Sequence, residues 1–234
     1  MNPILVALDV ESAAKAVELA DALRGSVGGF KIGKQLFTAA GPSMVRELTS
    51  RGDRVFLDLK FHDIPNTVAG AVQSAVSTGA WMVNVHASGG SAMMKAAGES
   101  ARKTAEQLGQ PRPLVIAVTV LTSMDDAALK EIGVGRPMIE QVVHLARLAQ
   151  DSGLDGVVAS PQEVPAIRKA CGADFQIVTP GIRPADQQGK DDQARTLTPA
   201  EAIAAGSSYL VIGRPITAAP NPRKAAETIA ATLP

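Results

Sequence analysis

The sequence has little cysteine, few aromatic side chains and no excess of either charge. Its single cysteine, Cys171, cannot form a disulfide within the chain. Unpaired thiols are typical of reducing compartments, so we expect a cytoplasmic protein. Lys plus Arg and Asp plus Glu each number 23, and aromatic residues make up 3%. We therefore expect no nucleic-acid partner, because the chain has neither an excess of basic residues nor many aromatic rings on which bases could stack.

Long hydrophobic runs are also missing. The first apolar run stops at Asp9 and has no basic residue before it, which is not the pattern of a secretory signal. No run approaches the roughly 18 apolar residues of a transmembrane helix, so we expect no membrane partner. What the 234-residue chain does contain is 46% hydrophobic residues, enough for the core of a globular domain.

Short apolar runs rich in β-branched residues alternate with Ala-rich stretches of helical spacing. Continuous apolar strands flanked by helices predict an α/β fold with a covered parallel sheet. The count favours a closed (β/α)8 TIM barrel over an open doubly wound sheet, the alternative that periodicity leaves open. No linker divides the chain, so residues 1–234 are expected to form a single domain. The eight runs are Ile4 to Asp9, Gly29 to Gly33, Val55 to Lys60, Trp81 to His86, Leu114 to Thr119, Gly156 to Ser160, Phe175 to Pro180 and Tyr209 to Gly213.

Polar residues stand at or just beyond the carboxyl ends of these runs, or in one case, Lys31, within a run; the carboxyl ends are where (β/α)8 barrels carry their chemistry. One such residue could be a structural hydrogen bonder, but many converging on one rim predict a site. They are Asp9, Lys31, Asp58, Lys60, His86, Thr119, Thr122, Thr179, Arg183 and Arg214.

The densest polar stretch follows the third run. Asp58 and Lys60 are two residues apart and share a face of a regular strand, while Asp63 in the next loop is close enough to join them. Two carboxylates beside one ammonium raise the lysine pKa, so Lys60 is predicted to act as a general acid. The alternative is a structural ion pair, which Lys31 on the neighbouring strand makes less favoured.

A second cluster, Gly213 and Arg214, follows the last run, where barrels often hold a phosphate. The turn-rich segment 183–195 follows the seventh run and is a candidate lid, although an ordinary solvated loop is the alternative. The sequence has no dinucleotide-binding glycine motif, no Walker loop and no zinc-ligand spacing. His86 is interpreted as supporting the pocket, and Cys171 as inert.

The ten residues Asp58-Leu59-Lys60-Phe61-His62-Asp63-Ile64-Pro65-Asn66-Thr67 resemble the signature of the orotidine 5'-phosphate decarboxylase family in its bacterial form. The resemblance implies a homodimeric barrel that converts orotidine 5'-phosphate to UMP and CO₂ without a metal ion or organic cofactor, the last step of de novo UMP synthesis. Further matching blocks occur in order at Ala7 to Asp9, Phe30 to Gly33, Val85 to Gly90, Val118 to Ser123, Thr179 to Pro184 and Val211 to Pro215.

The resemblance also implies roles for the charged residues. Asp58 would face the substrate carboxylate, and Lys60 would deliver a proton to C6 of the pyrimidine. Lys31 would join this charged network. Asp63 would complete it from the partner subunit, and Thr67 would reach the ribose side across the same interface.

The remaining implied roles concern binding. Asp9 and Lys31 would hold the ribose hydroxyls, and Thr122 would hydrogen-bond the pyrimidine edge. The phosphate would be held by Gln193, Gly213 and Arg214, with Arg183 at the base of the lid.

One position departs from the family pattern. The position that matches the family's phosphate-binding glutamine is Asp192, so the Asp-Gln pair is displaced by one residue. We assign the role to Gln193 and infer a one-residue insertion in the lid. Gln187 and Gln188 are the less favoured alternatives.

Two other functions are compatible with the sequence. One is a magnesium-dependent phosphosugar decarboxylase or aldolase of related barrel type, which would lack the Asp-Ile-Pro-Asn-Thr continuation found here. The other is a catalytically silent nucleotide-binding protein, which would be expected to have lost Lys60 or one of its aspartates.

Overall fold

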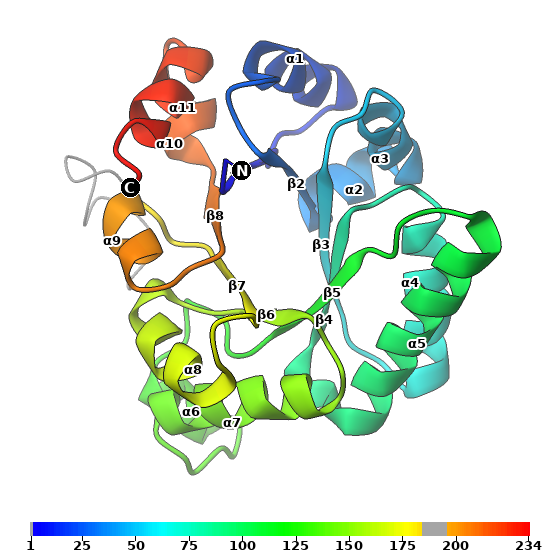
Figure 1. The fold of residues 1–234 in the computed structure, drawn as a ribbon, viewed down its shortest axis with the longest axis vertical. Coiled ribbons are helices and arrows are strands. Elements are labelled where there is room, and N and C mark those ends of the chain that lie inside the picture. Colours follow the sequence, from blue (N-terminus) through cyan, green and yellow to red (C-terminus); the bar gives the residue numbers. More distant parts are fainter. Residues whose placement is uncertain (1, 184–195) are drawn as a thin grey trace.

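A computed structural model shows parallel strands closed into a barrel with helices around it (Figure 1). The structure describes residues 2–183 and 196–234. Within them, eight strands follow each other around the barrel in sequence order. The ring closes where β8 pairs with β1, with Leu210 opposite Ile4 and Val211 opposite Leu5. The predicted (β/α)8 barrel is confirmed, and the open sheet is wrong.

Each predicted run contains one strand. Most runs extend one or two residues past the strand, because residues such as Asp9 already belong to the loops. The third strand is longer than predicted because it continues through an irregularity. The strands are β1 (Ile4–Ala7), β2 (Gly29–Gly33), β3 (Val55–Phe61), β4 (Met82–His86), β5 (Leu114–Val118), β6 (Gly156–Val158), β7 (Gln176–Thr179) and β8 (Tyr209–Ile212).

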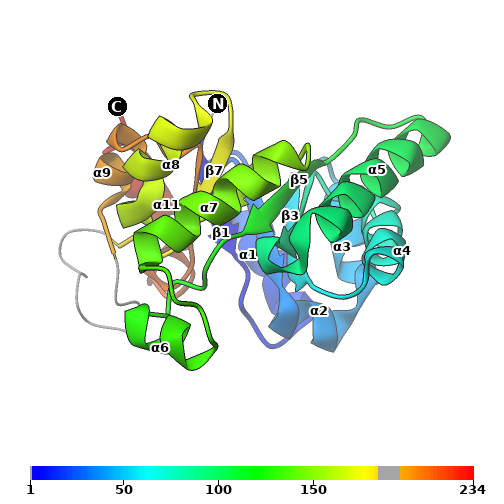
Figure 2. The ribbon, with the colours of Figure 1, turned by 90° about the horizontal axis from the view of Figure 1, so that it is seen from below.

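Helices surround the strands, with α5 and α7 in the foreground of Figure 2. Several begin at a proline, whose fixed φ suits the first turn; Pro65 at the start of α4 is one. The helices are α1 (Ala13–Leu23), α2 (Lys34–Ala40), α3 (Pro42–Thr49), α4 (Pro65–Val76), α5 (Gly90–Leu108), α6 (Asp126–Glu131), α7 (Met138–Asp151), α8 (Val164–Cys171), α9 (Pro199–Ala204), α10 (Arg214–Thr217) and α11 (Pro222–Ala230), with short turns η1 (Ala87–Gly89) and η2 (Pro161–Glu163).

Strand alternation divides the buried residues into two cores. On β1, Ile4 and Val6 face the helices, whereas Leu5 and Ala7 face the barrel interior. This is the period-two pattern of a strand with two buried faces. The interior core fills the part of the barrel nearer the amino ends of the strands. Toward the carboxyl ends of the strands, its apolar residues give way to polar ones. Strand position therefore decides which side chains reach the site.

The floor of the barrel is closed by aromatic side chains. Trp81 lies just before β4 and Tyr209 begins β8, and their rings meet edge to face with centroids 5.2 Å apart. The Arg54 guanidinium carbon lies 5.3 Å from the centroid of the Trp81 ring, a cation–π geometry. These residues pack against the interior core at the amino ends of the strands.

The sequence also predicted a lid and the absence of a membrane-spanning helix. Of the candidate lid 183–195, only Arg183 lies within the described residues, where it is buried. Throughout residues 2–183 and 196–234, no helix combines the length and apolar character needed to cross a bilayer.

Candidate active site

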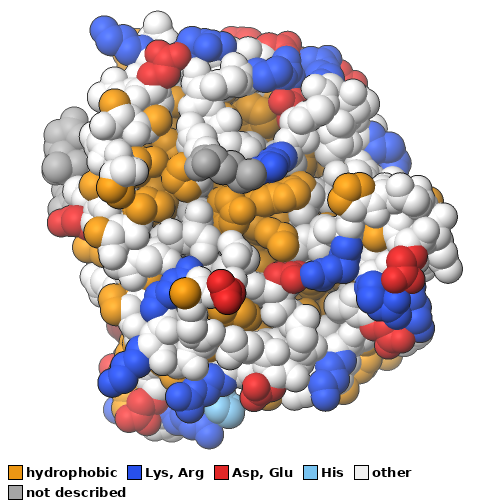
Figure 3. Space-filling model, in the orientation of Figure 1, with side chains coloured by type: hydrophobic (Ala, Val, Ile, Leu, Met, Phe, Trp, Pro, Cys, Tyr) orange, Lys and Arg blue, Asp and Glu red, His pale blue; other side chains and the backbone are white. Residues whose placement is uncertain are grey.

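A cavity of about 490 Å³ opens at the carboxyl ends of the strands. This volume falls within the range of small-molecule sites, about 300–1,000 Å³. Figure 3 shows the face of the molecule with a central hollow, apolar on its floor and charged along its edge. The predicted site residues that line the cavity are Asp9, Lys31, Asp58, Lys60, Thr122, Arg183, Gly213 and Arg214.

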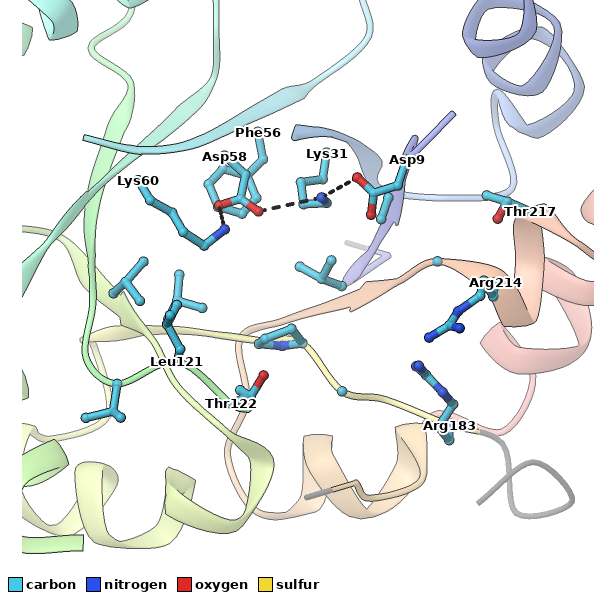
Figure 4. A pocket seen from close by; sticks show the side chains of 18 residues that line it. Asp9, Lys31, Phe56, Asp58, Lys60, Leu121, Thr122, Arg183, Arg214 and Thr217 are labelled. Carbon is cyan, nitrogen blue, oxygen red and sulfur yellow. Dashed lines mark hydrogen bonds and ion pairs between the residues drawn. The ribbon is translucent and has the colours of Figure 1, made fainter. Parts of the chain in front are cut away.

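Four of these side chains form a row of alternating charge along one wall (Figure 4). Lys31 Nζ donates to Asp9 Oδ1 at 2.8 Å and lies 3.6 Å from Asp58 Oδ2. Lys60 Nζ donates to Asp58 Oδ1 at 2.6 Å. Residues that are far apart in the sequence, from the loop after β1 and from β2 and β3, thus make one continuous charged row.

Asp58 is buried, 9% exposed, yet it remains ionised. Burial alone would raise its pKa, because a carboxylate loses hydration in the interior. The positive charges of Lys31 and Lys60, and hydrogen bonds from Lys60 and Asn84, outweigh burial and hold the pKa of Asp58 below its usual value. A negative charge is therefore fixed in the cavity at neutral pH.

The position of Lys60 depends on an irregularity in β3. The pairing of β3 with β4 moves from Leu57↔Val83 to Phe61↔Val85, so β3 carries extra residues between these pairs. Lys60 has a φ of 54°, the one positive value outside glycine among the described residues. Asp58 and Lys60 both line the cavity, as predicted, but through this bulge and not through regular alternation.

The far end of the cavity carries two arginines. In Figure 4, the side chains of Arg183 and Arg214 point toward each other, remote from Lys60. Gly213 precedes α10 and lines the same end. A pair of guanidinium groups beside exposed backbone suits a phosphate dianion.

Two residues for which the family resemblance implied site roles, Asp63 and Thr67, do not line the cavity of the described chain. Asp63 is exposed, and its Oδ1 accepts a hydrogen bond from the backbone N–H of Ile64 at 2.7 Å. The expectation that Asp63 is close enough to join the charged row within its own chain is wrong, because the loop turns it outward. Thr67 is exposed on the first turn of α4. Gln193 lies outside the described residues.

Two residues of the site were missed by the sequence analysis. A Cβ added to Gly33 would lie 2.8 Å from Lys31 Nζ and 2.9 Å from Asp9 Oδ1, so glycine makes room for this ion pair. Asn84 is fully buried and hydrogen-bonds Asp58. Its signal in the sequence was a polar residue inside an otherwise apolar run.

His86 and Cys171 are absent from the lining of the cavity. Burial, together with the nearby His62 and Lys60, lowers the pKa of His86 to about 4, so its ring is neutral at pH 7. Burial raises the pKa of the Cys171 thiol, which disfavours the reactive thiolate. The raised pKa agrees with the inert role expected for Cys171, and the supporting role of His86 stays a prediction.

A (β/α)8 barrel whose cavity holds a row of alternating charge and, at its far end, a pair of arginines is typical of enzymes that act on phosphorylated small molecules. A sequence profile of the "Orotidine 5'-phosphate decarboxylase / HUMPS family" matches residues 2–229. The chain belongs to this family, as its sequence resemblance predicted.

Individual relatives match along nearly the whole chain. The chain is 57% identical to orotidine 5'-phosphate decarboxylase of Moorella thermoacetica, covering 99% of this chain and 92% of the relative. It is 53% identical to that of Paramagnetospirillum magneticum, covering 100% and 99%. The crystal structure of orotidine 5'-phosphate decarboxylase from Lactobacillus acidophilus superimposes with a TM-score of 0.88 at 40% identity, covering 99% of each chain.

Proposed function

We propose that the protein converts orotidine 5'-phosphate to UMP and CO₂. The observation that carries the proposal is the shared cavity of the alternating row Asp9, Lys31, Asp58 and Lys60 and the arginines at its far end. A nucleotide anchored by its phosphate at Arg214 would present its base to Lys60. Relatives of that name at 53–57% identity support this assignment.

The binding residues divide the substrate between them. Arg183, Arg214 and the backbone at Gly213 take the phosphate, to which Gln193 is proposed to add a contact. Asp9 and Lys31 take the ribose hydroxyls. Thr122 hydrogen-bonds the edge of the pyrimidine; in Figure 4 it lies across the cavity from the charged row.

The reacting groups are Asp58 and Lys60. The bond between C6 and the carboxylate carbon breaks, its electron pair stays on C6, and CO₂ leaves. The Lys60 ammonium stabilises the developing negative charge and gives C6 a proton; the resulting amine regains a proton from water. Asp58 lies beside the departing carboxylate, and their repulsion is relieved as neutral CO₂ forms. No metal ion or organic cofactor enters this scheme.

The nearest competing function is that of a magnesium-dependent phosphosugar decarboxylase or aldolase. Both carboxylates of the row are already within ion-pair distance of a lysine. Over the described ranges, no group of three or more His, Cys, Asp or Glu side chains is arranged to hold a metal ion. The two functions are separated by their response to a chelator.

Purified protein should consume orotidine 5'-phosphate equally fast with and without EDTA, because the positive charge at C6 comes from Lys60. The ultraviolet absorbance change that accompanies conversion to UMP measures the rate. Activity that EDTA removes and Mg²⁺ restores would favour the competing enzyme. Unchanged substrate would favour the silent nucleotide-binding protein.

We further propose that the protein is a homodimer in which Asp63 and Thr67 enter the partner's cavity. Both are exposed beside Ile64, whose side chain is 67% exposed and forms an apolar surface on the loop before α4. A symmetric contact between two copies would cover this loop and complete two equivalent sites. Asp63 would then extend the row beyond Lys60 and give this lysine a second neighbouring carboxylate.

Mixing two inactive variants tests this arrangement. Lys60→Ala and Asp63→Ala chains, each inactive alone, should recover about a quarter of wild-type activity when they exchange subunits at random, since half the dimers then contain one intact site. Steady-state rates on orotidine 5'-phosphate measure the recovery. Mixing Lys60→Ala with Asp58→Ala is the matched control and should stay inactive, because both residues belong to the same chain's cavity. Hybrid dimers without activity in the first mixture would contradict shared sites.

Within the cell, we propose a cytoplasmic location. The chain's one cysteine, Cys171, is buried and has no second cysteine to pair with, which suits a reducing compartment.

A further inference from the structure

Asn84 is a fully buried polar side chain in the middle of β4. Its strand neighbours Val83 and Val85 face the helices, so Asn84 shares the interior face of the barrel with Met82. A buried amide is costly unless both its donor and its acceptor are satisfied. Its hydrogen-bond partners therefore indicate what it does there.

Both partners of Asn84 belong to the reacting pair. Its Nδ2 donates to Asp58 Oδ1 at 2.7 Å, and its Oδ1 accepts the backbone N–H of Lys60 at 2.8 Å. One neutral side chain thus links the carboxylate of Asp58 to the main chain of Lys60, the proposed proton donor. An amide supplies N–H donors and a carbonyl acceptor without adding charge.

The bridge lies opposite the bulge of β3. Between the pairs Leu57↔Val83 and Phe61↔Val85, β4 has a single residue, Asn84, and this residue lies opposite the extra residues of β3. There the Lys60 N–H bonds to a side-chain carbonyl in place of a strand carbonyl. The left-handed backbone of Lys60 (φ 54°) is unfavourable for a side chain that has a Cβ, so its surroundings must hold it.

The same bridge fixes the carboxylate of Asp58. Oδ1 receives hydrogen bonds from both Asn84 and Lys60 Nζ, which leaves Oδ2 turned toward Lys31 at 3.6 Å. The titratable groups around Asp58 are Lys31 on β2, Lys60 on β3 and His86 on β4. Asn84, which contacts the same carboxylate, does not titrate.

We propose that Asn84 is a positioning residue for the decarboxylation: it holds the Asp58 carboxylate and the strained Lys60 backbone so that the ammonium enters the cavity beside the reacting carbon. This inference rests on the proposed function. It assigns Asn84 no contact with substrate; its effect passes through Asp58 and Lys60.

Replacing Asn84 with alanine should lower kcat about 10²-fold, because small misplacements of reacting groups have effects of this size. Affinity for UMP should change little, since the phosphate and ribose contacts lie elsewhere. The acidic limb of the kcat profile should move to higher pH, because Asp58 loses a hydrogen bond to its ionised form. A merely structural residue would lower Tm without moving this limb.

Asn2 offers a matched control. Its Nδ2 donates to the carbonyl of Ser26 at 2.8 Å, and its Oδ1 accepts the N–H of Ile4 at 3.0 Å. It makes the same kind of bridge at the opposite end of the barrel. Asn2→Ala should therefore lower Tm but leave kcat and the pH profile unchanged.

The conservative variant Asn84→Asp separates the two halves of the bridge. Its new carboxyl can accept the Lys60 N–H but can donate to Asp58 only when protonated. The lost kcat should therefore be partly recovered as pH falls. If the Asn84→Ala protein does not fold, Asn84→Asp takes its place when kcat and the pH profile are compared with those of wild type.

The carboxyl carbon of Asp58, followed by ¹³C NMR during a pH titration, gives a readout that needs no turnover. Its pKa should rise in Asn84→Ala relative to wild type. An unchanged Asp58 titration, or kcat and acidic limb equal to those of wild type, would overturn the role of Asn84. Wild-type protein that leaves orotidine 5'-phosphate intact would instead overturn the proposed function, whatever the NMR result.

Discussion

Lys60→Ala should reduce decarboxylation of orotidine 5'-phosphate by at least about 10⁴-fold, while UMP still binds. In the proposed mechanism, the variant loses both the positive charge that stabilises the C6 carbanion and the proton that quenches it, and each contribution alone is typically worth about 10²–10³-fold or more. The proposed phosphate and ribose contacts of UMP involve Arg214, Asp9 and Lys31, which the substitution leaves in place. Single-turnover rates measure the loss, and calorimetric titration measures UMP affinity.

Lys130→Ala is the matched control for this experiment. Lys130 is an exposed lysine on α6 and is not among the residues lining the cavity. Its removal changes the net charge of the protein by the same amount, yet turnover should stay at the wild-type level. Turnover by Lys60→Ala within tenfold of wild type would remove Lys60 from the proton-donor role.

Removing the phosphate from the substrate should lower kcat/KM by at least about 10³-fold, although the phosphate is remote from the reacting carbon. Binding energy from distant groups can be used to align the reacting centre, so its loss lowers turnover as well as affinity. Arg183 and Arg214 lie at the end of the cavity opposite Lys60, which separates the two functions in space. Steady-state kinetics with orotidine in place of its 5'-phosphate measure this effect.

The variant Arg214→Ala tests whether this loss arises at the arginine end. It should lower kcat/KM for orotidine 5'-phosphate strongly but leave the already slow reaction of orotidine nearly unchanged, because the neutral nucleoside has no phosphate to contact. An equal fractional loss on both substrates would mean that Arg214 supports the cavity in general and does not bind phosphate.

The fold and much of the site were predictable from local pattern. Apolar runs separated by helical stretches define the strands of a barrel, and the barrel rule directs attention to their carboxyl ends. Asp9 and Arg214 were found in this way, because one ends and the other follows a run of apolar residues, and Lys31 was found as a charged residue inside such a run. For these positions, the place in the strand determines the place in the cavity.

The rest depends on tertiary geometry that sequence periodicity does not contain. Regular alternation predicted that Lys60 shares a face with Asp58, but the bulge and left-handed backbone that produce this result become visible only with the β3–β4 register. Asn84 is a single polar residue on another strand, and its importance follows from a contact across that register. The outward turn of Asp63 is set by its loop.

The aromatic pair on the floor of the barrel gives the protein a built-in fluorescent reporter. Trp81 and Tyr209 are the chain's one tryptophan and one tyrosine. Trp81 lies just before β4 and Tyr209 begins β8, two strands that lie across the ring from each other, so their contact joins opposite sides of the barrel. Indole emission therefore reports on the integrity of the scaffold from the end remote from the chemistry. In each variant discussed above, lost catalysis can be distinguished from lost structure without adding a label.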